Sequence, residues 1–377
     1  MTDRISRDET FMRAALDEAR KAHGRTSPNP AVGCVIVKNG RVIARGHHRR
    51  AGLPHAEVEA LRVAKKKAKG ATLYVNLEPC CHEGRTGPCT EAVLAAGVKE
   101  VVVGMRDPNP LVNGKGLRIL EKAGVKVRLG VLEHECRRLN EAFARWITSG
   151  RPHVTLKAAV TLDGRIAPAA WDDAPRWITG DEARAEAHRL RDVSDAILVG
   201  AGTVLADDPL LTTRLKGRAG RTPRRVVLDA RGRVPETARV LAPVDGAAPT
   251  TVFLGHDVPR AREEALARAG AEVVRLDTRE NAFSIAAVLE ALRERNVTSV
   301  LVEGGAEVFT AFLRARLVDR VRVFVAPALY GDAALGFLRA LPEPIHLENV
   351  TVTPFGSDVL FDGVPVFKAA AAARKVS

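Results

Sequence analysis

The sequence predicts an α/β protein built from two domains, residues 1–150 and 151–377. The chain has 377 residues, which exceeds the usual size of a single hydrophobic core. Helix-type and strand-type patterns alternate along both halves, which is typical of a largely parallel sheet covered by helices. A helical pattern ends near Gly150 and a new strand pattern begins after Pro152, so the domain boundary is placed between them.

The first half begins with a capping-box pattern, in which Ser6 is the N-cap and Glu9 lies three residues on. This pattern predicts a helix from Ser6 to about Ala22. The pair Asn39-Gly40 between two apolar runs predicts a tight hairpin turn. The further elements expected in this half are helices at 55–68, 88–97, 116–124 and 132–150 and strands at 71–77, 98–105 and 125–130.

The second half repeats the alternation of strands and helices, which predicts a second α/β domain. We expect strands at 151–160, 195–200, 224–229, 250–255, 271–276, 299–304 and 320–327. We expect helices at 180–191, 260–270, 284–295 and 306–317.

The charge is unevenly distributed. Residues 1–150 hold 27 Lys and Arg against 16 Asp and Glu, a balance of +11, whereas residues 151–377 hold 31 against 29, a balance of +2. A basic domain fits phosphate-bearing small substrates, nucleic acid or simply a solvated surface.

No apolar run approaches the roughly 18 residues of a membrane helix, and the charged start predicts no secretory signal. Five cysteines, an odd number, favour a reducing cytoplasm over a disulfide framework.

A possible zinc site lies in the first half. His55 precedes a predicted helix, and Cys80 and Cys89 flank a loop further on. One histidine and two cysteines leave a fourth zinc position open for water, as catalytic zinc requires. Glu57 then has a task, because it can carry protons between that water and a leaving group. The N-terminus of the helix at Cys89 is expected to lower the pKa of that thiol.

Two other interpretations of the cysteines stay open at this point. A structural zinc site would take Cys81 or His82 as a fourth ligand, but it would give the glutamate no role. The cysteines could also be ordinary packing residues, which is how we interpret Cys34 and Cys136. The order H-x-E…P-C…C is the signature of zinc nucleobase deaminases, here with a wider spacing between the cysteines.

The wider spacing between Cys80 and Cys89 is typical of one known family. HAEVEAL (55–61), LEPCCHEGRTGPC (77–89), DPNP (107–110) and SPNPAVGCVIV (27–37) resemble the deaminase domain of the bifunctional riboflavin-biosynthesis deaminase–reductase family. The resemblance implies a cytidine-deaminase-like α/β/α sandwich, zinc ligands at His55, Cys80 and Cys89, and a proton shuttle at Glu57. It also implies substrate contacts at Asn29 and Arg85. Cys81 and Gly87 replace the family's usual serine and proline.

The second half resembles the reductase domain of the same family, through TLKAAVTLDGRIA (155–167), WITG (177–180), VGAGTVLADDPLLTTR (199–214) and LVEGGAEVFTAFL (301–313). This resemblance implies a dihydrofolate-reductase-like α/β fold that uses NADPH. The implied NADPH contacts are Ala159, Trp177, Thr203, Asp207, Ala230, Gly305, Ala306, Glu307, Val308, Phe309, Thr310 and Ala311. The implied substrate contacts are Pro175, Arg191, Leu211, Arg214 and Glu303. Pro175 stands where the family commonly has serine, and proline offers neither a hydroxyl nor an amide donor.

We therefore expect two successive steps of riboflavin synthesis, zinc-dependent deamination and NADPH-dependent reduction, on a phosphorylated pyrimidine. We expect a cytoplasmic homo-oligomer with neither nucleic acid nor membrane as partner. The rivals are a zinc deaminase acting on RNA with an accessory binding domain, and a zinc-stabilised nucleic-acid adaptor without catalysis. The basic first half favours the rivals, whereas the near-neutral second half and its glycine turn argue against them.

Overall fold

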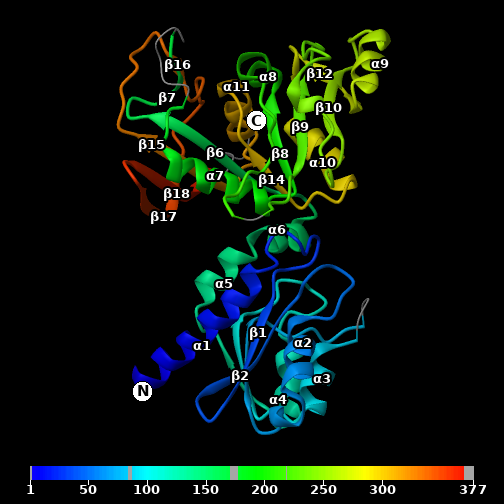
Figure 1. Cartoon of the computed structure of the whole chain (residues 1–377), viewed down its shortest axis with the longest axis vertical. Helices are drawn as coiled ribbons and strands as arrows, with labels where there is room; N and C mark the ends of the chain where they lie inside the picture. Colours follow the sequence, from blue (N-terminus) through cyan, green and yellow to red (C-terminus); the bar gives the residue numbers. More distant parts are fainter. Residues whose placement is uncertain (1, 84–86, 170–176, 218, 369–377) are drawn as a thin grey trace, which may run out of the picture. The chain divides into compact units, whose positions relative to one another are not determined.

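The computed structural model describes residues 2–83, 87–169, 177–217 and 219–368. Contacts divide the chain into two compact units, Met1–Arg151 and Pro152–Ser377, drawn from blue to teal and from green to red in Figure 1. Both units are α/β, as the sequence predicts. Among the described residues, no helix is long and apolar enough to cross a membrane.

The first unit is a five-stranded sheet between two layers of helices. Its strand order is β2-β1-β3-β4-β5, in which β1 is antiparallel to both neighbours and β3, β4 and β5 run parallel. The strands are β1 (Gly33–Lys38), β2 (Arg41–His47), β3 (Thr72–Leu77), β4 (Glu100–Met105) and β5 (Lys126–Leu129). The helices α1 (Thr2–Arg20) and α5 (Glu133–Leu139) lie on one side, and α2 (Ala56–Ala64), α3 (Cys89–Ala95) and α4 (Lys115–Lys122) lie on the other (Figure 1).

The expected hairpin is confirmed, since Asn39 and Gly40 have φ of 51° and 75° between β1 and β2. Both values suit the turn that matches the twist of the strands. The capping prediction at Ser6 is wrong, because α1 already begins at Thr2 and Ser6 lies inside it. The helix expected at 55–68 ends its α-helical part at Ala64 and continues as the 3-10 helix η1 (Lys65–Ala68).

The helix expected at 132–150 is divided into α5 and α6 (Glu141–Ser149). The break falls at Asn140, whose side chain is buried and binds the backbone of Ala31. Its Oδ1 accepts from the amide nitrogen of Ala31 at 2.8 Å, and its Nδ2 donates to the carbonyl oxygen at 3.1 Å. The break therefore holds the segment before β1, where Asn29 lies.

The second unit contains a nine-stranded sheet in the order β11-β10-β9-β8-β14-β6-β15-β18-β17. The strands from β11 to β15 in this order are parallel to one another. The strand β18 is antiparallel to both of its neighbours, β15 and β17. The strands of this sheet are β6 (His153–Thr161), β8 (Ala196–Gly200), β9 (Arg224–Asp229), β10 (Thr250–Gly255), β11 (Ala271–Leu276), β14 (Ser299–Val302), β15 (Arg320–Ala326), β17 (His346–Phe355) and β18 (Asp358–Val366). The sequence analysis missed β17 and β18, whose apolar patterns are interrupted by Pro354 and Pro365.

Helices supply a separate core to each face of this sheet. In β8, Ala196 and Leu198 belong to one buried cluster and Ile197 and Val199 to another, so the clusters lie on opposite faces. The first cluster takes in α10 (Ile285–Glu294) and α11 (Ala306–Arg314), and the second takes in α8 (Ala201–Asp207) and α9 (Arg260–Arg268). The remaining elements are α7 (Asp181–Val193), η2 (Arg239–Leu241), β7 (Arg165–Ala167), β12 (Thr278–Arg279), β13 (Ala282–Phe283) and β16 (Leu335–Gly336).

The close packing of α1 on the sheet gives a stability prediction. A methyl group on Gly33 would lie 2.1 Å from the carbonyl oxygen of Ala15, so Gly33→Ala forces α1 away from β1. Overpacking of this kind costs about 1–3 kcal/mol, and calorimetry should show the first unit melting roughly 2–10 °C lower. Gly202→Ala is the control, because a methyl there meets no atom within 4 Å in α8. Equal melting temperatures for the two variants would contradict this packing.

Candidate functional site

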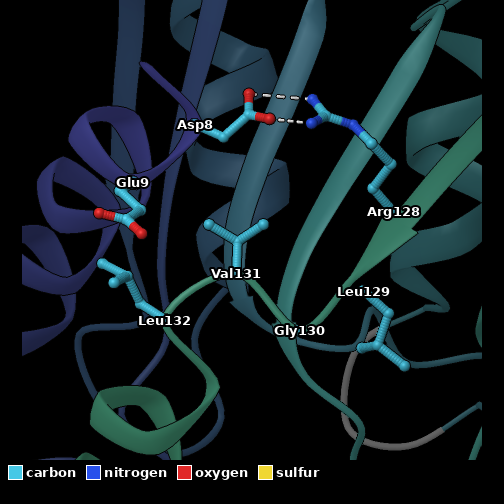
Figure 2. Close-up of a pocket in the computed structure, with 7 residues that line it drawn as sticks. All are labelled: Asp8, Glu9, Arg128, Leu129, Gly130, Val131 and Leu132. Carbon is cyan, nitrogen blue, oxygen red and sulfur yellow. Dashed lines mark hydrogen bonds and ion pairs between the residues drawn. The ribbon is translucent and has the colours of Figure 1, made fainter. Parts of the chain in front are cut away.

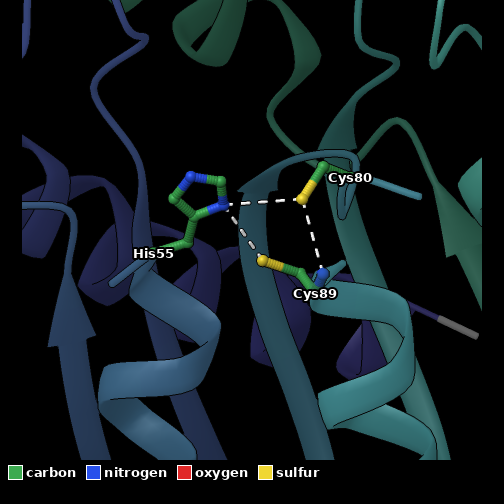
Figure 3. Close-up of side chains that lie close together, drawn as sticks. All are labelled: His55, Cys80 and Cys89. Atoms are coloured by element: carbon green, nitrogen blue, oxygen red, sulfur yellow. Dashed lines mark hydrogen bonds between the residues drawn. The ribbon is translucent and has the colours of Figure 1, made fainter. Parts of the chain in front are cut away.

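Two helix starts and one loop bring His55, Cys80 and Cys89 together (Figure 3). His55 is the N-cap residue of α2, with an extended ψ of 166°, so its side chain is not committed to a helix face. Cys80 lies in the loop that follows β3, and Cys89 is the first residue of α3. Their ligand atoms all lie within 4.8 Å of one another.

The cluster has the donor set of a zinc site. His55 Nδ1 lies 3.2 Å from the Sγ of Cys89 and 3.5 Å from the Sγ of Cys80. Nitrogen and thiolate sulfur are the donors that zinc takes in proteins, and three protein ligands are typical of its catalytic sites. Among the described residues, neither Cys81 nor His82 joins the group, which removes support for a four-ligand structural site.

The two cysteines share their protons unequally. A hydrogen bond from Cys89 and the proximity of His55 lower the pKa of Cys80 to about 4, against the effect of burial. The same pairing, together with burial, raises the pKa of Cys89. This reverses the expectation that the helix start favours a thiolate at Cys89. The hydrogen bond between the two sulfur atoms is the main cause, and the first amide of α3 adds to it by donating to the Sγ of Cys80 at 3.4 Å.

Glu57 lies beside the cluster, in the first turn of α2, and is 3% exposed. Burial raises its pKa to about 7, and the charge of Cys80 adds to the effect. Its Oε2 has no hydrogen-bond partner among the described residues. A buried carboxylate oxygen without a partner is costly, so this atom fits a position that faces a bound group. The chemistry of the donor set and this unpartnered oxygen together fit a zinc ion.

His48 is a residue of this site that the sequence analysis missed. Its Nδ1 lies 3.2 Å from the carbonyl oxygen of Pro54, and its Nε2 lies 3.1 Å from the Nδ2 of Asn29. The His48 ring also meets the His55 ring edge-on, with centroids 5.1 Å apart. His48 therefore links Asn29, an expected substrate contact, to the metal cluster. A histidine directly after the end of β2 gave no signal of this role in the sequence.

Glu78 was also missed, although it precedes the Pro79-Cys80 pair. It is 2% exposed and accepts hydrogen bonds from the backbone nitrogens of Asp107, Gly114 and Leu117, at 3.2, 2.9 and 3.3 Å. The DPNP segment is thereby tied to the loop that carries Cys80. Burial raises the pKa of Asp107 to about 6, and its Oδ1 accepts from the amide of Asn109.

A hollow elsewhere on this unit has a structural explanation. It is lined by Asp8, Glu9, Arg128, Leu129, Gly130, Val131 and Leu132, and Figure 2 shows the Asp8 carboxylate facing the Arg128 guanidinium. The same carboxylate accepts from the hydroxyl of Tyr74 at 2.8 Å, and the guanidinium donates to Glu100 at 2.9 Å. These charges satisfy one another, and no residue of the cysteine cluster lines the hollow.

The second unit holds a buried ion pair at the expected substrate residues. Arg191 of α7 donates to both carboxylate oxygens of Glu303 at 2.8 and 2.7 Å, and its Nη1 donates to the carbonyl oxygen of Thr212 at 3.1 Å. Burial would raise the pKa of Glu303, but the charges of Arg191 and Lys157 outweigh it and lower the pKa to about 2. Leu211, the residue before Thr212, is 3% exposed and has a φ of 52°.

Lys157 and His188 belong to the same cluster and were not expected. Lys157 on β6 is half-buried, and the loss of contact with water lowers its pKa, while the charge of Glu303 opposes that effect. His188 Nδ1 accepts from the backbone nitrogen of Arg214 at 3.3 Å. Burial and the charges of Arg191 and Arg214 lower the pKa of His188 to about 4. Lys157 lies inside the TLKAAVTLDGRIA motif, so its position was visible in the sequence but its partners were not.

The expected NADPH residues come from the carboxyl ends of parallel strands, which meet at one edge of the sheet. Ala159 lies near the end of β6, α8 with Thr203 and Asp207 follows β8, Ala230 follows β9, and the segment 305–311 follows β14. Thr203 and Gly305 are neighbours, because a methyl group on Gly305 would lie 3.4 Å from the Thr203 Oγ1. Gly305 also has φ of 80°, and it is the N-cap of α11. Such a start can receive a phosphate on its backbone amides.

Other expected residues differ in their surroundings. Val308, Phe309 and Thr310 are buried inside α11, and the backbone nitrogen of Phe309 donates to the carbonyl oxygen of Gly305 at 3.0 Å. Ala306 is also buried, Ala311 is half-buried, and Glu307 and Asp207 are exposed. Trp177 is 54% exposed, with the Arg184 guanidinium 5.5 Å from its ring centroid. Arg85 and Pro175 lie outside the described residues.

Two family models together match most of the chain. The cytidine and deoxycytidylate deaminase zinc-binding region matches residues 5–105, and the RibD C-terminal domain matches residues 152–361. Curated relatives named riboflavin biosynthesis protein RibD match nearly end to end. The protein from Aquifex aeolicus is 43% identical, with 94% of this chain and 97% of the relative covered, and that from Escherichia coli is 40% identical, with 87% and 90% covered.

Solved structures agree with these matches. Acinetobacter baumannii RibD (form 1) aligns with a TM-score of 0.81 at 37% identity, covering 96% of this chain and all of that one. The Thermotoga maritima diaminohydroxyphosphoribosylaminopyrimidine deaminase/5-amino-6-(5-phosphoribosylamino)uracil reductase aligns with a TM-score of 0.80 at 39% identity, with coverage of 96% and 100%. The predicted fold class is confirmed, with a cytidine-deaminase-like first domain and a dihydrofolate-reductase-like second domain. The chain belongs to the RibD family of riboflavin biosynthesis proteins.

Proposed function

We propose that the two units carry out two successive steps of riboflavin biosynthesis, deamination within residues 1–150 and reduction within residues 151–377. The chain is a bifunctional deaminase and reductase, with Zn2+ and NADPH as its cofactors. The first substrate is 2,5-diamino-6-ribosylamino-4(3H)-pyrimidinone 5′-phosphate, and the second is 5-amino-6-(5-phosphoribosylamino)uracil. The grouping of His55, Cys80 and Cys89 around a buried Glu57 is the observation that carries the first assignment.

His55, Cys80 and Cys89 hold the zinc ion in this proposal. When bound, zinc supplies a Lewis acid that lowers the pKa of a water molecule to about 7. Glu57 moves the protons, and burial, which raises the pKa of its carboxyl group, favours the protonated form that such a carrier needs. Its Oε2 takes a proton from the water, whose oxygen adds to the ring carbon that carries the amino group, and returns a proton to the amino nitrogen. The carbon–nitrogen bond then breaks, and ammonia leaves. Asn29, positioned by His48, and Arg85 bind the substrate.

In the second unit NADPH supplies the hydride for the ribosyl C1 of the intermediate. Gly305 and the start of α11 bind the cofactor together with Thr203, and the further contacts are those expected from the sequence. Arg191 and Arg214 bind the phosphate monoester, since guanidinium groups suit multidentate phosphate contacts. Glu303 fixes the Arg191 guanidinium through two hydrogen bonds. Glu303, Leu211 and Pro175 complete the proposed substrate contacts.

We also propose that the protein acts in the cytoplasm as a homo-oligomer, on small molecules rather than on nucleic acid or at a membrane. Five free cysteines support a reducing compartment. The RNA deaminase alternative is not favoured, because both halves match the RibD family in order. Steep salt-dependent binding of RNA at low micromolar affinity would reverse that preference. Light scattering on the purified chain would determine the oligomeric state.

The adjacent cysteines give a paired test of the metal ligands. Cys80→Ser should lose both zinc and ammonia release, because serine does not replace the thiolate ligand. Cys81→Ser should keep both, since Cys81 lies outside the cluster. Zinc per chain is measured by atomic spectrometry and ammonia by a coupled assay. Loss of zinc in Cys81→Ser would show that the ligand set is wrong.

Glu57→Gln tests the proton carrier. The amide is close in size but cannot exchange protons, so ammonia release should fall by about 10²–10⁴-fold while zinc stays near one per chain. Glu59→Gln, two residues along the same helix and paired with Arg62, is the matched control and should retain its activity. If Glu57→Gln also loses its zinc, Glu57 is a ligand rather than a proton carrier.

Arg214→Ala tests the phosphate contact in the second unit. The Arg214 side chain is exposed, so its removal should leave the fold intact. A charged hydrogen bond contributes about 1.5–3 kcal/mol, so the KM for the phosphorylated intermediate should rise roughly 10- to 100-fold. Lys216→Ala removes a nearby exposed cation and should change the KM little. Equal effects of the two variants would indicate a general charge effect instead of a specific contact.

A further inference from the structure

His188 has no role in the function proposed so far, yet it lies inside the cluster of the reductase unit. Its Nδ1 accepts a hydrogen bond from the backbone nitrogen of Arg214 at 3.3 Å. The two residues are 26 positions apart in the sequence, so the contact joins α7 to the segment that follows α8. A ring nitrogen can accept only while it carries no proton, so the contact requires neutral His188.

The segment Leu211–Arg214 is held at two backbone points, and both come from α7. Arg191 donates to the carbonyl oxygen of Thr212 at 3.1 Å, and His188 accepts from the nitrogen of Arg214. Positions three apart on a helix face the same side, so α7 presents both groups to this segment together. The segment also contains the left-handed residue Leu211, whose conformation needs support from its surroundings.

The Arg214 side chain also bonds to this segment. Its Nη1 donates to the Oγ1 of Thr212 at 2.9 Å, while the side chain itself is exposed. We propose that His188 is a positioning residue for substrate binding: its Nδ1 holds the backbone of Arg214 so that the guanidinium meets the substrate's phosphate. This inference rests on the function proposed above, in which the second unit reduces a phosphorylated intermediate.

The charges around His188 keep the hydrogen bond intact at neutral pH. Burial and the positive charges of Arg191, Arg214 and Lys157 lower the pKa of His188 to about 4, while the negative charge of Glu303 opposes them. The lowered pKa favours the neutral ring, and the bond from the Arg214 nitrogen selects the tautomer that carries its proton on Nε2, so Nδ1 keeps its lone pair.

His188→Phe and His188→Asn separate positioning from packing. Phenylalanine keeps the ring but offers no acceptor, whereas the asparagine Oδ1 lies as many bonds from the backbone as Nδ1 and can accept. His188→Phe should raise the KM for 5-amino-6-(5-phosphoribosylamino)uracil about tenfold with little change in kcat, as expected for a lost binding contact. His188→Asn should recover most of that loss. The dephosphorylated intermediate should be reduced with nearly the same KM by wild type and both variants.

Three controls make the result decisive. An unchanged KM for NADPH reports that the second unit of each variant is intact, and ammonia release by the first unit of the same chain should equal that of wild type. Arg189→Ala removes an exposed neighbour on α7 and should resemble wild type. The inference is overturned if His188→Phe keeps the wild-type KM, if His188→Asn is no better than His188→Phe, or if kcat falls as much as affinity. A wild-type chain that does not reduce the intermediate would overturn the proposed function, and this inference with it.

Discussion

The chemistry of the first unit depends on one meeting point, where the starts of α2 and α3 reach the loop after β3. His55 lies just before α2, so its ring does not occupy a face of that helix, and Cys89 is the first residue of α3. The first amide of α3 donates to the Sγ of Cys80, and this bond adds to the effect of the Cys89 thiol in lowering the pKa of Cys80. Asn140 and Glu78 then tie the neighbouring segments to this point through backbone hydrogen bonds. A displaced helix start would separate the three ligands at once.

The second unit depends on a buried charge cluster instead of a metal. Glu303 follows β14, and its bidentate bond to Arg191 connects the carboxyl edge of the sheet to α7. Removing one member of a buried pair leaves the other charge uncompensated, so such a pair is sensitive to substitution. The neighbouring parallel strands β8 and β14 bring Thr203 and Gly305 to the same edge of the sheet. Gly305 is only two residues after Glu303 in the sequence. The sheet fixes the positions of these residues, while the cations Arg191, Arg214 and Lys157 make the site suitable for an anion.

Much of this arrangement could be predicted from the sequence, for reasons that differ between residues. His55, Cys80 and Cys89 form a motif whose residue types have few other uses together, and the structure brings them within bonding reach. His48 and His188 could not be found, because each acts through a contact with a residue far along the chain. Asn140 breaks a helix for the same reason, since its side chain binds Ala31. The strands β17 and β18 were missed because sheet pairing outweighs the local effect of Pro354 and Pro365.

A chain that holds both units should perform two reactions in order on one substrate. The most direct measurement incubates the full chain with the diaminopyrimidine ribosylamino phosphate, with and without NADPH, and determines the product masses. Without NADPH, we expect release of ammonia and a product in which an amino group is replaced by oxygen. With NADPH, we expect a further product that has gained a hydride and a proton. An unchanged substrate mass in both incubations would show that the chain does not catalyse these reactions.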